Sequence, residues 1–240
     1  LDIGGKAKLN TREKEEHGRL LNAVNKTSAA QDRAIRAAQS QAKIHLELSA
    51  GTPEFSLTHH LVNISSRNVL EAKEDAESWI KGKLGSPQKD GSFIRWHEGP
   101  QGHRADASPA GHRITLGPES QSASAVHEMG HQIEFNVKGV KAAAGEFLEH
   151  RVGRQAARKI SEIIPNSNYA DHEIGRDDDF GKAFGKDAAW YVGKKYPGGD
   201  TEIISMGLEK LYADPTGFAK ADPEYCTFML GILDGSLRTP

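Results

Sequence analysis

The chain has 240 residues, of which 27% are charged and 37% hydrophobic, and 25 are glycine. This composition is typical of a globular protein with many loops and enough apolar residues for a sizeable core. The net charge of −2 argues against extensive nucleic-acid binding, and the single cysteine, Cys226, excludes an internal disulfide and a cysteine-rich zinc knuckle.

No apolar run approaches the ~20 residues that a bilayer-spanning helix needs. The first residues, LDIGGKAKLN, lack the apolar segment of a signal peptide. We therefore expect no membrane association and no secretion signal.

Residues 1–50 are polar and alanine-rich, with their few apolar residues at helical spacing, which predicts an N-terminal helical extension or linker. GTPEF follows, and we expect one domain over residues 51–240. Residues 6–43 hold nine Lys and Arg against four Asp and Glu, an excess of +5. This segment is a solvated tether or, alternatively, a basic patch for an acidic partner such as nucleic acid.

The next part of the chain combines one helix with short strands. Residues 65–84 have apolar residues at helical spacing, and Gly85 ends the pattern. Three short apolar segments separated by turns at GPQG and SPAG then predict strands over 92–98, 103–108 and 112–117. We expect the HRITL strand to lie at the sheet edge, where an extended peptide could add to it.

The remaining sequence is mainly helical. Ser120 or Ser122 is positioned to cap a helix over about residues 124–135, and helices are expected over 140–164, from Asp200 or Thr201 to 212, and over 223–233. Residues 190–200 predict a turn. The predicted fold class is α+β, with a small sheet packed on the helix of residues 124–135 and a mainly helical C-terminal part.

That central helix carries the sequence HEMGH. His127 and His131 are four residues apart, so both point to the same side of a helix and could bind one metal ion. Two imidazoles plus a third protein ligand and a water form a catalytic zinc site. Glu128 is placed to act as general base toward a zinc-bound water that attacks a carbonyl group. The alternative is an amphipathic helix with solvated histidines.

Two further features of this helix concern packing. Val126, Met129 and Ile133 form an apolar stripe that predicts a buried face. Gly130 lies in the helix interior, where glycine costs about 1 kcal/mol relative to alanine. We therefore expect another segment to pack tightly against this turn.

The third ligand remains open from the residues alone. If the chain turns at Gly139, the next helix could bring Glu146, Glu149 or His150 level with the metal. Glu202, in the first turn of a later helix, is an equal candidate.

The segments HEMGHQIE, AAAGEFLEHR and TEIISMGLEKLYADPTGFAKADPEYCTFMLGIL resemble the zincin-like domain of tailed-phage head-morphogenesis and minor-capsid proteins. The likeness covers about residues 90–235, and the arrangement is similar to that of the gluzincins. It implies a zincin-like fold, Zn²⁺ held by His127, His131 and Glu202, and a tyrosine shortly before the last ligand, Tyr196 or its rival Tyr191, as oxyanion donor. The gap between His131 and Glu202 is longer than in the best-known gluzincins.

The resulting hypothesis is a zinc metallopeptidase that cleaves a protein or peptide substrate. The resemblance implies a phage or prophage origin, a location in the host cytoplasm or virion, and phage capsid or portal proteins as partners. The alternatives are a non-catalytic structural module of a phage head and a metallopeptidase toxin domain that acts on a host protein.

Overall fold

The computed structural model describes residues 60–62, 64–80, 94–110, 112–164, 169–177 and 180–237. Our expectations for residues 1–50, including the helical extension and the basic patch, lie outside these ranges. Within them the chain is a mixture of helices and small sheets, so the α+β prediction is confirmed at this level. No helix in the described ranges is both long and apolar enough to cross a membrane.

A four-stranded sheet forms the first layer. Its strands are β1 (His60–Val62), β2 (Arg95–Glu98), β3 (Asp106–Ser108) and β4 (Arg113–Leu116). Their order in the sheet is β1-β2-β4-β3, with β3 antiparallel to β4 and the other pairs parallel. Trp96 of β2 lies opposite Ile114 of β4, and both side chains are fully buried.

The three segments predicted as strands thus contain β2, β3 and β4. The placement of HRITL at the sheet edge was wrong, because β4 lies between β2 and β3. The edge strand on this side is β3, which is paired with β4 alone.

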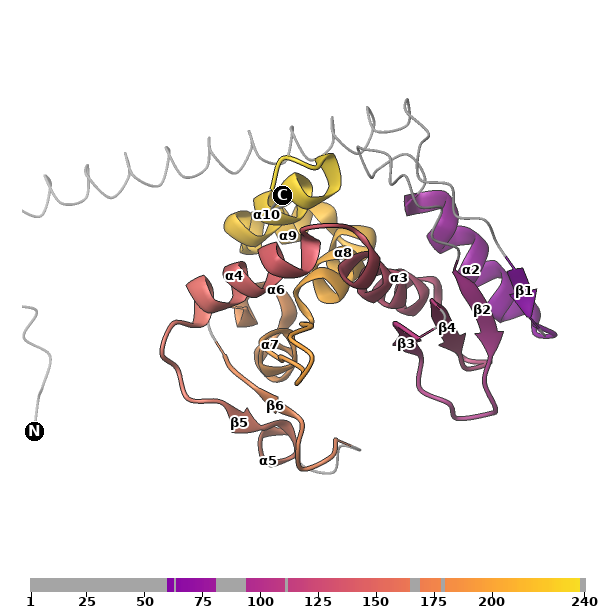
Figure 1. Cartoon of the computed structure of the whole chain (residues 1–240), viewed down its shortest axis with the longest axis horizontal. Coiled ribbons are helices and arrows are strands. Elements are labelled where there is room, and N and C mark those ends of the chain that lie inside the picture. Colours follow the sequence, from indigo (N-terminus) through magenta and orange to yellow (C-terminus); the bar gives the residue numbers. More distant parts are fainter. Residues whose placement is uncertain are drawn as a thin grey trace, which may run out of the picture.

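Helix α3 (Ser122–Asn136) lies at the centre of the molecule. In Figure 1 the four-stranded sheet and α2 (Arg67–Ile80) lie on one side of it and the C-terminal helices lie on the other. It packs against α2, β3, β4, α4 (Val140–Val152) and α8 (Ile203–Ala213). All residues from Ala125 to Glu134 are therefore buried, including the predicted apolar stripe.

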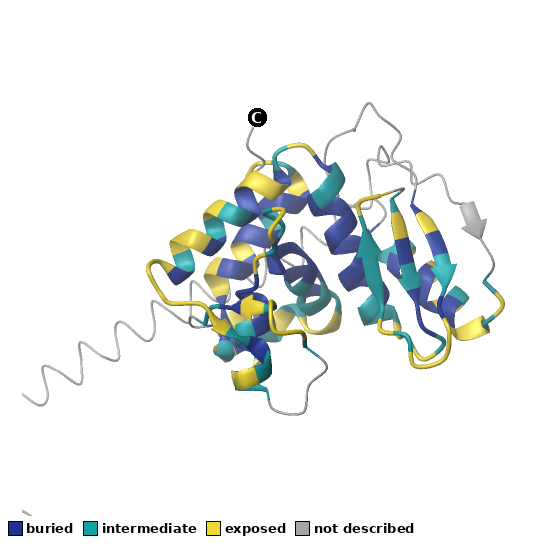
Figure 2. Ribbon diagram, turned by 60° about the horizontal axis from the view of Figure 1, so that its bottom comes forward, coloured by how far each residue is buried: buried dark blue, intermediate teal, exposed yellow. Residues whose placement is uncertain are grey.

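Besides α8, the C-terminal region contains five helices within the described ranges. They are α5 (Ile160–Ile163), α6 (Gly181–Phe184), α7 (Lys186–Val192), α9 (Pro215–Ala221) and α10 (Pro223–Asp234). A separate two-stranded sheet pairs β5 (Arg158–Lys159) with β6 (Ile174–Gly175). Figure 2 shows buried residues where helices meet and exposed residues on their outer faces and in loops.

Three local predictions were wrong. The helix expected over 140–164 ends at Val152, because Gly153 adopts φ 54° and its N–H bonds to the carbonyl of Glu149. Part of the turn expected over 190–200 belongs to α7. Neither Ser120 nor Ser122 caps α3: the N-cap is Gln121 without a side-chain bond, and the Ser122 hydroxyl donates to Asp75.

Candidate metal centre

Helix α3 presents His127 and His131 on one side, as their spacing predicts. Both side chains are largely buried, yet both line a cavity. Their rings meet edge to face with centroids 5.1 Å apart. The helix thereby supplies two imidazoles to one point at the edge of the core.

Glu202, at the start of α8, completes a group of three potential ligands. Its Oε2 lies 3.3 Å from Nε2 of His127 and 3.2 Å from Nε2 of His131. The three ligand atoms lie within 4.8 Å of one another, and all three residues are buried. This His-His-Glu group could hold a metal ion.

The other three candidates for third ligand lie elsewhere. The chain turns at Gly139 as expected, but α4 buries Val140, Ala144 and Leu148 in the core. Glu146, Glu149 and His150 lie on its opposite, exposed face. There Glu149 accepts a hydrogen bond from Lys195, and His150 approaches Glu224.

The close approach of α8 to α3 explains Gly130. A Cβ atom at this position would lie 2.5 Å from Cα and 2.9 Å from the backbone N of Ser205. The tight packing expected from this glycine is therefore confirmed, and it comes from the helix that carries Glu202. Side-chain contacts at such a crossing would hold the two helices too far apart for His-His-Glu convergence.

Several hydrogen bonds fix the Glu202 carboxylate, which is fully buried. The Tyr196 hydroxyl donates to its Oε1 at 2.6 Å, and the Ser205 hydroxyl donates to its Oε2 at 2.6 Å. Both oxygens are thus oriented before any cation arrives.

Glu209, which the sequence analysis missed, holds His127. Its Oε2 lies 2.9 Å from Nδ1 of His127, the nitrogen that faces away from Glu202. Carboxylates commonly orient metal-binding histidines in this way. The available signal was its spacing: Glu209 stands seven residues after Glu202, which is two helical turns along the same side of α8.

Glu134 holds the segment that leads into Glu202, and it too was missed. Its Oε1 accepts bonds from the backbone N–H and the hydroxyl of Thr201, at 2.8 and 3.0 Å. The residue is 1% exposed, and its Oε2 has no hydrogen-bond partner within the described part of the chain. Burial raises the pKa of Glu134 to about 8, although the bonds from Thr201 lower it.

Charge is balanced within the His-His-Glu group. Burial acts to lower the pKa of His127, but hydrogen bonds to Glu202 and Glu209 raise it to about 10. Burial acts to raise the pKa of Glu202, but the neighbouring His131 and His127 hold it well below its usual range. The carboxylate is therefore ionised and needs a nearby positive charge, a requirement that a divalent cation can meet.

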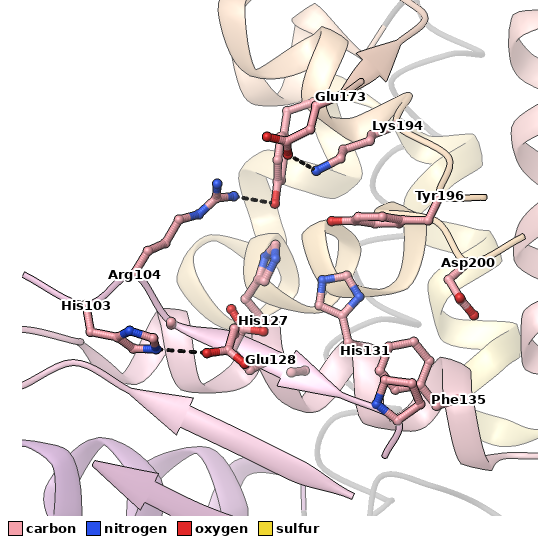
Figure 3. Close-up of a pocket in the computed structure, with 15 residues that line it drawn as sticks. His103, Arg104, His127, Glu128, His131, Phe135, Glu173, Lys194, Tyr196 and Asp200 are labelled. Carbon is pink, nitrogen blue, oxygen red and sulfur yellow. Dashed lines mark hydrogen bonds and ion pairs between the residues drawn. The ribbon is translucent and has the colours of Figure 1, made fainter. Parts of the chain in front are cut away.

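Glu128 points into the same cavity (Figure 3). It is 6% exposed, and this burial raises its pKa, while the adjacent histidines act in the opposite direction. A raised pKa makes a carboxylate a stronger base, which suits a group that takes a proton near neutral pH.

Two tyrosines stand near Glu202. Besides Tyr196, Tyr191 stacks on His127 with centroids 6.3 Å apart, and its hydroxyl accepts a hydrogen bond from Arg104 at 2.8 Å. Burial raises the pKa of both phenols, and the negative charge of Glu202 raises it further. Both hydroxyls therefore stay protonated and can donate.

The cavity in front of the group has a volume of about 500 Å³. One wall is the β3 segment with Asp106 and Ala107, and the opposite wall holds Glu173, Lys194 and Tyr196 (Figure 3). A second cavity of about 470 Å³ shares His127, Glu128 and Tyr191 with the first. The two form one cleft that passes the His-His-Glu group.

Comparisons of this chain with protein-family models, with curated proteins and with solved structures find no match.

Proposed function

We propose that the protein is a zinc-dependent peptidase with a zincin-like fold. The observation that carries the proposal is the buried group of His127, His131 and Glu202 at an open cleft, with Glu128 beside it. Two imidazoles and one carboxylate are the ligand types of catalytic zinc sites, which keep one position open. When bound, zinc lowers the pKa of a coordinated water and polarises a carbonyl group.

Glu128 serves as the general base. It takes a proton from the water as the water oxygen bonds to the carbonyl carbon of the substrate. It then gives this proton to the amide nitrogen as the C–N bond breaks, which yields a carboxylic acid and an amine. The acid proton then passes to the amine, so that the products leave as a carboxylate and an ammonium group. Its position directly after His127 puts it in the cavity with both histidines.

Tyr196 serves as the oxyanion donor. Its protonated hydroxyl, which donates to Glu202 at 2.6 Å, can turn to the substrate oxygen as negative charge develops there. Tyr191 is the rival donor, because its hydroxyl accepts a bond from Arg104 and keeps its own proton, but the stacking of its ring on His127 restricts its movement.

The substrate is a peptide in extended conformation. Strand β3 pairs with β4 on one side, and its residues Asp106 and Ala107 line the cavity. A peptide that adds to the edge of β3 would run along the cleft past Glu128. A phage or prophage origin, with head proteins as partners, follows from the sequence resemblance alone and is part of the proposal.

Two variants test the chemistry. Glu128→Gln should retain zinc and lose peptide cleavage, because an amide cannot accept the proton; cleavage at the wild-type rate would reject the proposed role. Glu202→Ala should lose zinc in elemental analysis of the purified protein. The matched control, Glu149→Ala, removes an exposed glutamate of α4 and should keep it.

The non-catalytic and toxin alternatives predict different results. A structural head module should bind zinc yet cleave no member of a peptide library. A toxin domain should arrest growth when it is expressed in a host, and Glu128→Gln should relieve the arrest.

A further inference from the structure

The charges that line the cleft are mostly paired. Lys194 donates to Glu173 at 2.5 Å, Asp106 approaches His103 at 2.8 Å, and Asp200 pairs with Lys141 outside the cavity at 2.7 Å. Among the described basic side chains that line the two cavities, Arg104 is the one without a carboxylate partner within ion-pair distance in the described part of the chain.

Arg104 lies where the two cavities meet. It precedes β3, lines both cavities together with His127 and Glu128, and remains exposed. In Figure 3 its guanidinium extends from the strand side toward the segments that carry Glu173 and Lys194. It therefore stands beside the path that an extended peptide would take.

Two tyrosines hold the guanidinium of Arg104 in place, and in the described part of the chain no carboxylate lies within ion-pair distance of it. It lies over the rings of Tyr169 and Tyr191, at 5.2 and 5.6 Å from their centroids, and donates to the Tyr191 hydroxyl. These contacts fix its plane and use one of its five N–H donors. A fixed guanidinium with spare donors is suited to bind a carboxylate through two parallel hydrogen bonds.

We propose that Arg104 is a specificity-determining residue that selects peptides with an acidic side chain close to the bond to be cleaved. This inference rests on the proposed peptidase function and adds its substrate class. The carboxylates of Glu128 and Glu202 lie beside the histidines and the metal position, where a divalent cation would offset them. Lys194 is already paired with Glu173, so the charge of Arg104 is the one left for the substrate.

The experiment measures binding and cleavage separately. The probe is a positional-scanning library of fluorescent hexapeptides with amidated C-termini, in which each position in turn carries Glu or Gln. Binding is measured by anisotropy on the zinc-loaded Glu128→Gln protein, and cleavage is measured on the wild-type protein. Amidation removes the terminal carboxylate, and a free-acid series shows whether that group is recognised instead.

At one position, Glu should bind roughly tenfold or more tightly than Gln, as expected for a charge-assisted hydrogen bond. Adding Arg104→Gln should abolish this preference. The matched control, Arg113→Gln on β4, removes one exposed positive charge that lines neither cavity and should preserve it.

The inference is overturned by equal binding of Glu and Gln peptides at every position, by a preference that survives Arg104→Gln, or by a preference for the terminal carboxylate alone. If Arg104→Gln strengthens the binding of all peptides equally, Arg104 obstructs the cleft and does not select acidic peptides. Cleavage without acidic preference refutes this inference and leaves the peptidase proposal intact. If the protein binds acidic peptides preferentially but the wild type cleaves none of them, the peptidase proposal fails and the role of Arg104 in selecting acidic peptides stands.

Discussion

Replacing Gly130 by alanine tests whether the crossing of α3 and α8 brings the His-His-Glu group of the proposed metal centre together. The added Cβ would lie 2.5 Å from Ser205 Cα, and ordinary contact begins at 3.4 Å, so the helices must separate by about 0.9 Å (3.4 − 2.5). The obstacle is backbone, which cannot rotate away. Glu202 stands three residues before Ser205 and is bonded to its hydroxyl, so it would move with α8.

Two effects on stability oppose each other. Alanine favours a helix interior by about 1 kcal/mol over glycine, whereas forcing extra volume into a packed contact costs about 1–3 kcal/mol. We expect a net loss of about 1 kcal/mol in the free energy of unfolding of the metal-free protein. A ligand displacement near 1 Å should lower catalytic activity by about a hundredfold and weaken zinc binding as well.

The assays are urea denaturation of metal-free protein and zinc titration against a chelator. Gly145→Ala is the matched control, because it lies in helix α4 and its added Cβ would meet no atom within 4 Å. This control should gain stability and bind zinc like the wild type. A Gly130→Ala protein that matches the control in both assays would refute the account of the crossing.

Two further substitutions probe the residues that support the proposed metal ligands. Glu209→Gln should lower zinc affinity by about 10–100-fold, since the carboxylate orients His127. The control, Glu146→Gln on the exposed face of α4, should leave zinc affinity unchanged. If both variants bind zinc as tightly as the wild type, Glu209 has no part in the site. The pKa of Glu134 rises from 4.5 to about 8 on folding, so its contribution to stability is full below pH 4.5 and is lost as the pH rises toward 8. The glutamine of Glu134→Gln stays neutral at every pH and can still accept the hydrogen bonds from Thr201. Urea denaturation should therefore give this variant a higher free energy of unfolding than the wild type above pH 8, by on the order of 4 kcal/mol. At pH 5 the two free energies of unfolding should be similar. A pH-independent difference would contradict this assignment.

The sequence predicted those features that depend on local spacing. The His127–His131 pair, the buried stripe of α3 and the strands around Trp96 and Ile114 follow from periodicity within a few residues. The long helix over 140–164 failed because a single glycine, Gly153, ends it by taking a positive φ, a conformation that periodicity does not reveal.

The support around the ligands depends on contacts between distant segments. Glu134 is an ordinary residue of a helix until Thr201, 67 positions later, is placed beside it. Arg104 likewise acquires its surroundings from Tyr169 and Tyr191. Glu202 was an open choice from the residues alone, and resemblance rather than spacing favoured it.

Gln132 ties the edge strand to the ligand-bearing helix. Its side-chain amide donates to the carbonyls of Ser108, at the end of β3, and Arg113, at the start of β4, each at 3.0 Å. Gln132 directly follows His131, so adjacent residues of helix α3 carry the imidazole and hold strand β3. If a peptide adds to that strand as proposed, the two hydrogen bonds of Gln132 help to set its distance from the histidines, together with the packing of α3 on β3 and β4.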